Sequence, residues 1–279
     1  TINPLAHLPF DPDTLAPASK QETVLIVGGG AAGMQAAITA CDRGQKVILA
    51  EQGPRLGGLL RFTDVDTDKP DLMNFKNLLV REVERRDIDV RLNTVITPEN
   101  ITSFGADGVI FATGSLPSCP PVPGIGHAHK AMDMYDGKVK PGHKIVMVGG
   151  GLVGGETALH LAQHGRSVTL LEMGEYLIPD GLFTERLHTL HFLEEAVEIH
   201  TSTRCTELSP EGVTAVSRGG ETLFFPADTV VIAAGMKPRT EERDSFYGTA
   251  YDVVPVGDCV RLGNLVGATR TGFDAGIRL

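Results

Sequence analysis

The sequence predicts an α/β protein that contains two copies of one strand–turn–helix–strand plan. The first observation is a glycine-rich turn, "VLIVGGGAAG" (Val24 to Gly33), which recurs as "IVMVGGGLVG" (Ile145 to Gly154). The second is that each turn follows a short apolar run and opens an amphipathic stretch with helical periodicity. The third is that one offset of 121 residues relates landmarks throughout both copies. One architectural plan is therefore present twice.

The landmarks that share this offset include the glycines of both turns, the glycine that ends each helix, a glutamate and a later turn. They pair Gly28, Gly30 and Gly33 with Gly149, Gly151 and Gly154, Gly44 with Gly165, Glu51 with Glu172, and Ala112–Gly114 with Ala233–Gly235. Chance does not keep one register over so many positions. The copies arose by duplication or by convergence on the same chemistry.

The elements follow the same order in each copy. A strand (24–27 or 145–148) leads into the turn, a helix ends near Gly44 or Gly165, and a second strand ends in glutamate. Further helices are expected at 71–86 ("DLMNFKNLLVREVERR") and 181–196 ("GLFTERLHTLHFLEEA"). The segment "VTAVSRGGETLFF" predicts a hairpin that turns at Gly219 and Gly220.

Bulk properties exclude several function classes. A chain of 279 residues accommodates two domains. The net charge of -10 and the absence of a basic stripe argue against a nucleic-acid partner. We find no apolar run near the roughly 18 to 20 residues that a membrane span requires, so no membrane association is expected. Four widely spaced cysteines without a CxxC pair or a signal peptide predict a cytoplasmic protein.

The first residues differ in composition from the rest. Residues 1–21 contain four prolines and predict an extended arm or linker. The chain starts at Thr1 instead of methionine, so we expect a piece of a longer protein, with a processed native start as the alternative.

Each glycine turn and its glutamate form the pattern of a dinucleotide site. In GxGxxG the first glycine permits a tight turn, the second lets a pyrophosphate approach the backbone, and the third lets helix and strand pack closely. The helix N-terminus favours the negative charge. Glu51 and Glu172 lie about 20 residues further on, where a carboxylate accepts hydrogen bonds from a ribose. Dinucleotide binding is predicted for both copies, and two empty turns are the alternative.

Three further motifs carry a family resemblance. "RLGGLL" (Arg55 to Leu60), "VIFATGS" and "VPVGDCV" join the two fingerprints, and the chain resembles the flavoprotein module of the glutathione and thioredoxin reductase class. The resemblance implies two Rossmann-like domains, the second inserted in the first. It places an FAD-binding domain at 22–137 and 240–279, closing with a helix from about Ala268, and an NAD(H)-binding domain at 138–239.

The resemblance also assigns cofactor-binding positions. For FAD they are Gly28, Gly30, Ala32, Gly33, Glu51, Gln52, Gly58, Leu59, Arg61, Val95, Ala112, Thr113, Gly114, Gly257, Asp258, Ala268 and Thr269. For NAD they are Gly149, Gly151, Leu152, Val153, Gly154, Glu172, Ala234 and Gly235. NADH is favoured over NADPH, because a 2'-phosphate would meet the Glu172 carboxylate. Arg166, six residues earlier, is the alternative: it could instead pair with a phosphate.

The chain lacks the CxxC or CxxxxC pair with which disulfide reductases of this class pass electrons on. Its start, "TINP", resembles the segment after the last cluster cysteine in the 2,4-dienoyl-CoA reductase and 2-enoate reductase family. That resemblance implies a 4Fe-4S cluster and an FMN-bearing TIM barrel in a preceding part of the same polypeptide. Electrons would pass from NADH through FAD to these groups, and self-association is an open possibility.

Two rival functions remain at this point. One is a stand-alone NADH oxidase or ferredoxin-reductase-like flavoprotein. The other is a structural domain that binds ADP where FAD would lie, as trimethylamine dehydrogenase does in a module that this chain resembles.

Other features are interpreted as structural. The pairs His160/His164 and His188/His191 have metal-ligand spacing but no completing ligand, so no metal site is predicted. Cys259 is expected to be a small buried side chain, and Cys119 an incidental thiol. The acidic stretch 64–71 is expected to be a surface loop.

Overall fold

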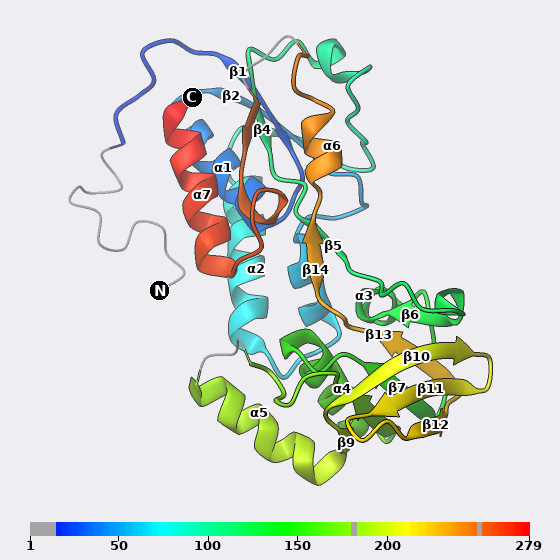
Figure 1. The fold of residues 1–279 in the computed structure, drawn as a ribbon. Helices are drawn as coiled ribbons and strands as arrows, with labels where there is room; N and C mark the ends of the chain where they lie inside the picture. The colour runs from blue at the N-terminus through cyan, green and yellow to red at the C-terminus, as the bar shows by residue number, and fades with distance from the viewer. Residues whose placement is uncertain (1–14, 180–182, 250–252) are drawn as a thin grey trace. The chain divides into compact units, whose positions relative to one another are not determined.

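The computed structural model describes residues 15–179, 183–249 and 253–279, and it divides the chain into two compact units (Figure 1). Unit 1 combines the residues up to Leu116 with Lys237–Leu279, and unit 2 is Pro117–Met236. The second unit is thus inserted in the first. The "TINP" segment and most of the expected arm lie outside the described residues.

The boundaries of the inserted unit differ from the sequence expectation, by three residues (237–239) at its second end and by more at its first. Residues 117–137 belong to unit 2, whereas the sequence analysis placed them in the first domain. The reason is that β6 (Ala128–Lys130) pairs in parallel with β13 (Thr229–Ile232), a strand of the second sheet. β5 (Ser115–Pro117) and β14 (Met236–Pro238), where the chain leaves and re-enters unit 1, pair with each other.

Unit 1 is built around a parallel sheet with the strand order β15-β4-β1-β2-β3. Its strands are β1 (Thr23–Val27), β2 (Lys46–Ala50), β3 (Ile88–Arg91), β4 (Gly108–Phe111) and β15 (Val253–Pro255). Its helices are α1 (Ala31–Asp42), α2 (Pro70–Glu84), α6 (Thr240–Asp244) and α7 (Leu265–Arg278), with short 3-10 helices η2 (Gly58–Asp64), η3 (Ile101–Phe104) and η5 (Gly257–Cys259).

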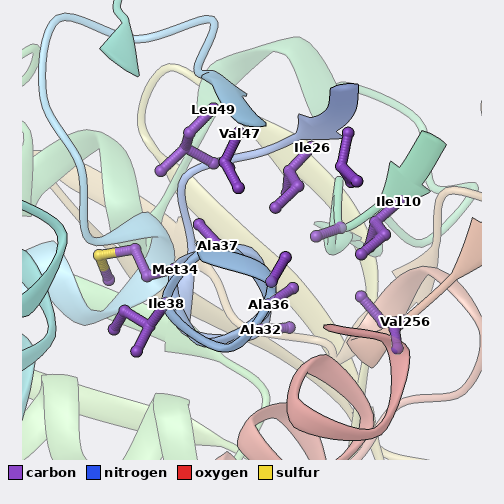
Figure 2. Close-up of a cluster of buried hydrophobic side chains, with 14 of the residues drawn as sticks. Ile26, Ala32, Met34, Ala36, Ala37, Ile38, Val47, Leu49, Ile110 and Val256 are labelled. Carbon is purple, nitrogen blue, oxygen red and sulfur yellow. The ribbon is translucent and has the colours of Figure 1, made fainter. Parts of the chain in front are cut away.

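The core of unit 1 forms where α1 covers the sheet. Figure 2 shows Ile26, Val47, Leu49 and Ile110 of the strands facing the small and apolar side chains of α1. On the other side of α1 lies α7 (Figure 1), where Gly272 is needed for close packing. A Cβ at Gly272 would lie 2.2 Å from the carbonyl oxygen of Ala32. This contact holds the C-terminal helix against the helix that follows the first glycine turn.

Unit 2 repeats the parallel sheet in the order β6-β13-β7-β8-β9 and adds an antiparallel sheet, β10-β11-β12. Its remaining strands are β7 (Lys144–Val148), β8 (Ser167–Leu171), β9 (Glu198–His200), β10 (Thr203–Ser209), β11 (Gly212–Ser217) and β12 (Thr222–Pro226). Its helices are α3 (Ala131–Tyr135), α4 (Leu152–Gln163), α5 (Phe183–Ala196) and the 3-10 helix η4 (Ile125–His127). The predicted hairpin is confirmed: β11 and β12 pair around the turn at 218–221.

The acidic stretch before α2 is exposed at Asp64 and Asp68, as expected of a surface loop. Asp66 departs from this expectation, because its side chain is buried. No helix in the described part of the chain is both long and apolar enough to cross a membrane.

Candidate nucleotide-binding sites

Both glycine turns lie at the carboxyl ends of the central strands of their sheets, β1 and β7. Ligands of parallel α/β sheets bind at this edge. Gly28 and Gly149 each have φ of 110°, a conformation that side chains rarely allow. We call the turn at 28–33 with Glu51 the first site, and the turn at 149–154 with Glu172 the second site.

The close approaches in the two turns are nearly identical. A Cβ on Gly28 would lie 2.4 Å from the carbonyl oxygen of Ala112, and one on Gly149 would lie 2.4 Å from that of Ala233. At the third glycine, a Cβ on Gly33 or Gly154 would lie 1.9 Å from the carbonyl oxygen of the first glycine of its turn. The third glycines therefore let α1 and α4 start directly against the preceding strand.

The second glycines, Gly30 and Gly151, are different because they leave space. Each is the N-cap of its helix with extended backbone, and a Cβ there would make only an ordinary contact or none. The backbone amides that open α1 and α4 thus face an uncrowded surface. Such amides bind a pyrophosphate, so the structure fits the group that the fingerprint implies.

Each site glutamate holds two backbone amides. The Glu51 carboxylate accepts hydrogen bonds from the amides of Gly29 and Gly53, both at 2.7 Å. Glu172 accepts from Gly150 and Gly174, both at 2.6 Å. These carboxylates therefore connect the glycine turn to the loop after the second strand. Each oxygen keeps lone-pair capacity for a ribose hydroxyl.

The first site has additional polar groups at the ends of β4 and β15. The hydroxyl oxygen of Thr113 is buried, and no group in the described part of the chain hydrogen-bonds to it. The Asp258 carboxylate accepts from the Gly263 amide at 3.2 Å and from the Ser115 hydroxyl at 3.4 Å. Burial raises the pKa of Asp258. A buried hydroxyl and a half-buried carboxylate at this place fit a cofactor that carries further hydrogen-bonding groups beyond its pyrophosphate.

Several expected FAD positions lie in accessible places around this turn. Gly58 and Arg61 are part of η2, Leu59, Gln52 and Val95 are exposed, and Gly114 and Gly257 turn with positive φ. Ala32 and Gly33 are buried at the end of the turn, and Ala112 is buried directly after β4. In the second site Leu152 and Val153 are exposed in the first turn of α4, and Ala234 and Gly235 are exposed after β13.

The C-terminal helix starts earlier than expected. α7 begins at Leu265, with Asn264 as an N-cap that accepts from the Gly267 amide, whereas the sequence analysis began it near Ala268. Ala268 and Thr269 therefore lie inside the helix, and the Thr269 hydroxyl donates to the carbonyls of Leu265 and Val266. The Ala268 amide donates to the Asn264 carbonyl at 3.1 Å, so neither Ala268 nor Thr269 opens the helix. The asparagine before the apolar run was the signal for this start.

Arg166 cannot act at the ribose end of the second site. It precedes β8, and Glu172 follows β8 at the opposite end of the strand. A strand rises about 3.3 Å per residue, so roughly 20 Å separate the two backbones. An arginine side chain does not span this distance.

The histidines and cysteines that the sequence analysis singled out lie as follows. The ring centroids of His160 and His164 are 4.2 Å apart, and the His188 ring packs edge-on against Phe192. Cys259 is fully buried, as predicted, and burial raises the pKa of its thiol. Cys119 is exposed.

A family model for pyridine nucleotide-disulphide oxidoreductases matches residues 22–252. The chain belongs to this family. It is therefore an oxidoreductase domain of the FAD- and NAD-binding class, as its two fingerprints predicted. The family name refers to a disulfide, yet the four cysteines of this chain have neither of the redox-active spacings.

The relatives include enzymes of the enoate-reductase type, which confirms the resemblance found in the sequence. NADH oxidase of Thermoanaerobacter brockii is 35% identical over 98% of this chain and 43% of that protein. Cinnamate reductase of Clostridium sporogenes is 32% identical over 93% of this chain and 40% of that protein. A solved complex of 2-naphthoyl-CoA reductase with 2-naphthoyl-CoA matches with a TM-score of 0.90 and 29% identity, covering 96% of this chain and 42% of that one. The chain thus spans about two fifths of the length of these relatives.

Proposed function

We propose that this chain is an NADH-oxidising flavoprotein module, with FAD at the first site and NADH at the second. Bound FAD would supply the redox chemistry for oxidation of NADH, and the chain's own residues would hold the two cofactors. The electrons would pass to an iron–sulfur cluster and an FMN-bearing domain outside this chain, and support reduction of a C=C bond in an enoate or enoyl-CoA-like substrate. The names of the cinnamate and 2-naphthoyl-CoA reductases support this substrate class.

The observation that carries the cofactor assignment is a difference between the turn that follows β4 in the first site and the turn that follows β13 in the second site. Thr113 in the first site corresponds to Ala234 in the second, at the same offset as the glycines. Only the first of these positions offers a hydroxyl, and Asp258 lies in the same unit. FAD has a ribitol and a flavin ring with many hydrogen-bonding atoms, so the first site fits it better.

The protein's own groups would bind and orient the cofactors. The amides at the starts of α1 and α4 would hold the two pyrophosphates, Glu51 and Glu172 the adenosine riboses, and Asp258 the ribitol. The positions that the sequence analysis assigned to each cofactor are part of this proposal. A cytoplasmic location and self-association stay predictions.

Three variants of the full chain test the assignment. Gly30→Ala places a methyl group where it makes only an ordinary contact with Gly58, so the protein should fold, but it blocks the approach of a pyrophosphate. We expect it and Asp258→Ala to lower FAD affinity more than tenfold and to leave ADP-ribose binding unchanged. Gly151→Ala should instead lower the affinity for ADP-ribose and leave FAD binding unchanged. FAD retention is read from visible absorption, and ADP-ribose binding from calorimetry.

Two results would contradict the assignment. One is loss of FAD in the Gly151→Ala variant with FAD retained in Gly30→Ala, which would exchange the two sites. The other is full binding of both ligands by all three variants, which would place the nucleotides elsewhere.

A further inference from the structure

The turn between β11 and β12 is held next to the ribose end of the second site by the backbone. The carbonyl oxygen of Glu172 accepts a hydrogen bond from the Thr203 amide at 2.9 Å. Thr203 begins β10 and pairs in antiparallel register with Ser217, the last residue of β11. Arg218 is the next residue. The sheet therefore delivers one arginine to the region of the Glu172 carboxylate, although 46 positions separate the two in sequence.

The loop after β8 supplies a second carboxylate at the same place. Gly174 is fixed because its amide donates to the Glu172 carboxylate at 2.6 Å, and Glu175 follows it directly. The Glu175 carboxylate lies 3.9 Å from the guanidinium of Arg218. Both side chains are largely exposed, with 58% and 77% of their surface accessible. The pair is therefore in water and can be reached by a ligand.

The two glutamates differ in how firmly their charge is held. Glu172 accepts from two backbone amides and cannot turn away, so its negative charge stays at the ribose position. Glu175 makes one long contact with a cation, and both partners are free to rearrange. Arg218 is thus a cation at the edge of the site whose charge is compensated by Glu175.

We propose that Glu175 and Arg218 determine how strongly the second site rejects a 2'-phosphorylated coenzyme. Glu175 neutralises Arg218 and so withholds from a 2'-phosphate the cation that would otherwise bind it. Glu172 repels the same phosphate directly. This inference rests on the proposed coenzyme role of the second site and adds a specificity pair to it.

Removing the Glu175 charge should release Arg218 for the phosphate. We expect Glu175→Gln to raise the affinity for 2'-phosphorylated ADP-ribose about fivefold, near the upper end for an exposed charge pair. The affinity for ADP-ribose itself should stay within about twofold, because the uncharged 2'-hydroxyl has no use for the cation. The double variant Glu175→Gln/Arg218→Ala should return to the selectivity of the wild type. Calorimetry on the full chain, with both ligands at low and high salt, measures these differences, and salt should reduce the gain.

Glu207→Gln is a matched control. Glu207 is an exposed carboxylate on β10 in the same antiparallel sheet, four residues from Thr203. Four residues of strand correspond to about 13 Å, so this variant changes the net charge equally but away from the site. Its selectivity should equal that of the wild type.

The outcomes separate the two levels of the proposal. An unchanged selectivity in Glu175→Gln, a gain that persists in the double variant, or an equal gain in Glu207→Gln would overturn the specificity pair. Failure of the wild type to bind either form of ADP-ribose would overturn the coenzyme role of the second site, and the specificity pair with it.

Discussion

Replacing Gly154 by alanine separates the structural role of a glycine turn from its ligand-binding role, when compared with the same change at Gly151. A Cβ at position 154 would lie 1.9 Å from the carbonyl oxygen of Gly149 and 3.2 Å from the Cβ of Ala233. A Cβ at position 151 would have no neighbour within 4 Å. The two substitutions add the same methyl group, three residues apart, to very different surroundings.

The magnitudes follow from these distances. An ordinary contact begins near 3.4 Å, so in Gly154→Ala the start of α4 and the Gly149 carbonyl oxygen must move apart by about 1.5 Å. Overpacking of this kind costs about 1 to 3 kcal/mol or more, and the better helix propensity of alanine returns up to about 1 kcal/mol. We expect a net loss of about 2 kcal/mol in the free energy of unfolding. Gly151→Ala should lose at most about 1 kcal/mol, from the N-cap position.

Scanning calorimetry and ADP-ribose titration check both halves of this prediction. Gly154→Ala should lower the unfolding temperature of unit 2 by roughly 6 to 10 °C. Gly151→Ala should unfold near the wild-type temperature but lose ADP-ribose binding, because its methyl group occupies the approach of the pyrophosphate. Equal destabilisation by both variants, or wild-type binding by Gly151→Ala, would refute the reasoning.

Three further predictions concern charge and thiols. Glu51→Ala should destabilise unit 1 by about 2 to 4 kcal/mol in urea unfolding, because two amides lose their acceptor, whereas a loss below about 1 kcal/mol would mean that water replaces the carboxylate. Hydrogen bonds from the Lys144 and His143 amides lower the pKa of Asp228, so its contribution is present above the ordinary carboxyl pKa near 4 and is lost as pH falls through the lower folded value. Asp228→Asn should therefore flatten the acid limb of stability against pH, and an unchanged limb would contradict this. In the native protein a thiol reagent followed by mass spectrometry should label Cys119 and not Cys259, and early labelling of Cys259 would show that its burial is not maintained.

The repeated fold could be predicted because the restrictions on glycine are local. Gly28 and Gly149 need positive φ, and Gly33 and Gly154 need the absence of a Cβ, so the sequence carries these requirements at fixed spacing. The positions of the Glu51 and Glu172 carboxylates could be predicted from the sequence as well. Each lies at the end of a strand whose partner strand carries the turn.

Other features depend on packing that no local pattern records. The assignment of residues 117–137 follows from the pairing of β6 with β13, which are about 100 residues apart. The approach of Arg218 to Glu175 follows from the register of β10 and β11. Ile178 has φ of 49° although it is β-branched, and its fully buried side chain packs against Gly155. Propensity argues against this conformation, and only the tertiary contact explains it.

The most direct test of the central claim is an anaerobic titration of the FAD-loaded chain with NADH, followed by absorption in the visible flavin band. The proposed pairing of a flavin site with a coenzyme site predicts that the band bleaches with about one equivalent of NADH and that NADPH acts much more weakly. A flavin band that persists in excess NADH would contradict transfer between the two sites and leave nucleotide binding as the only activity that the structure supports.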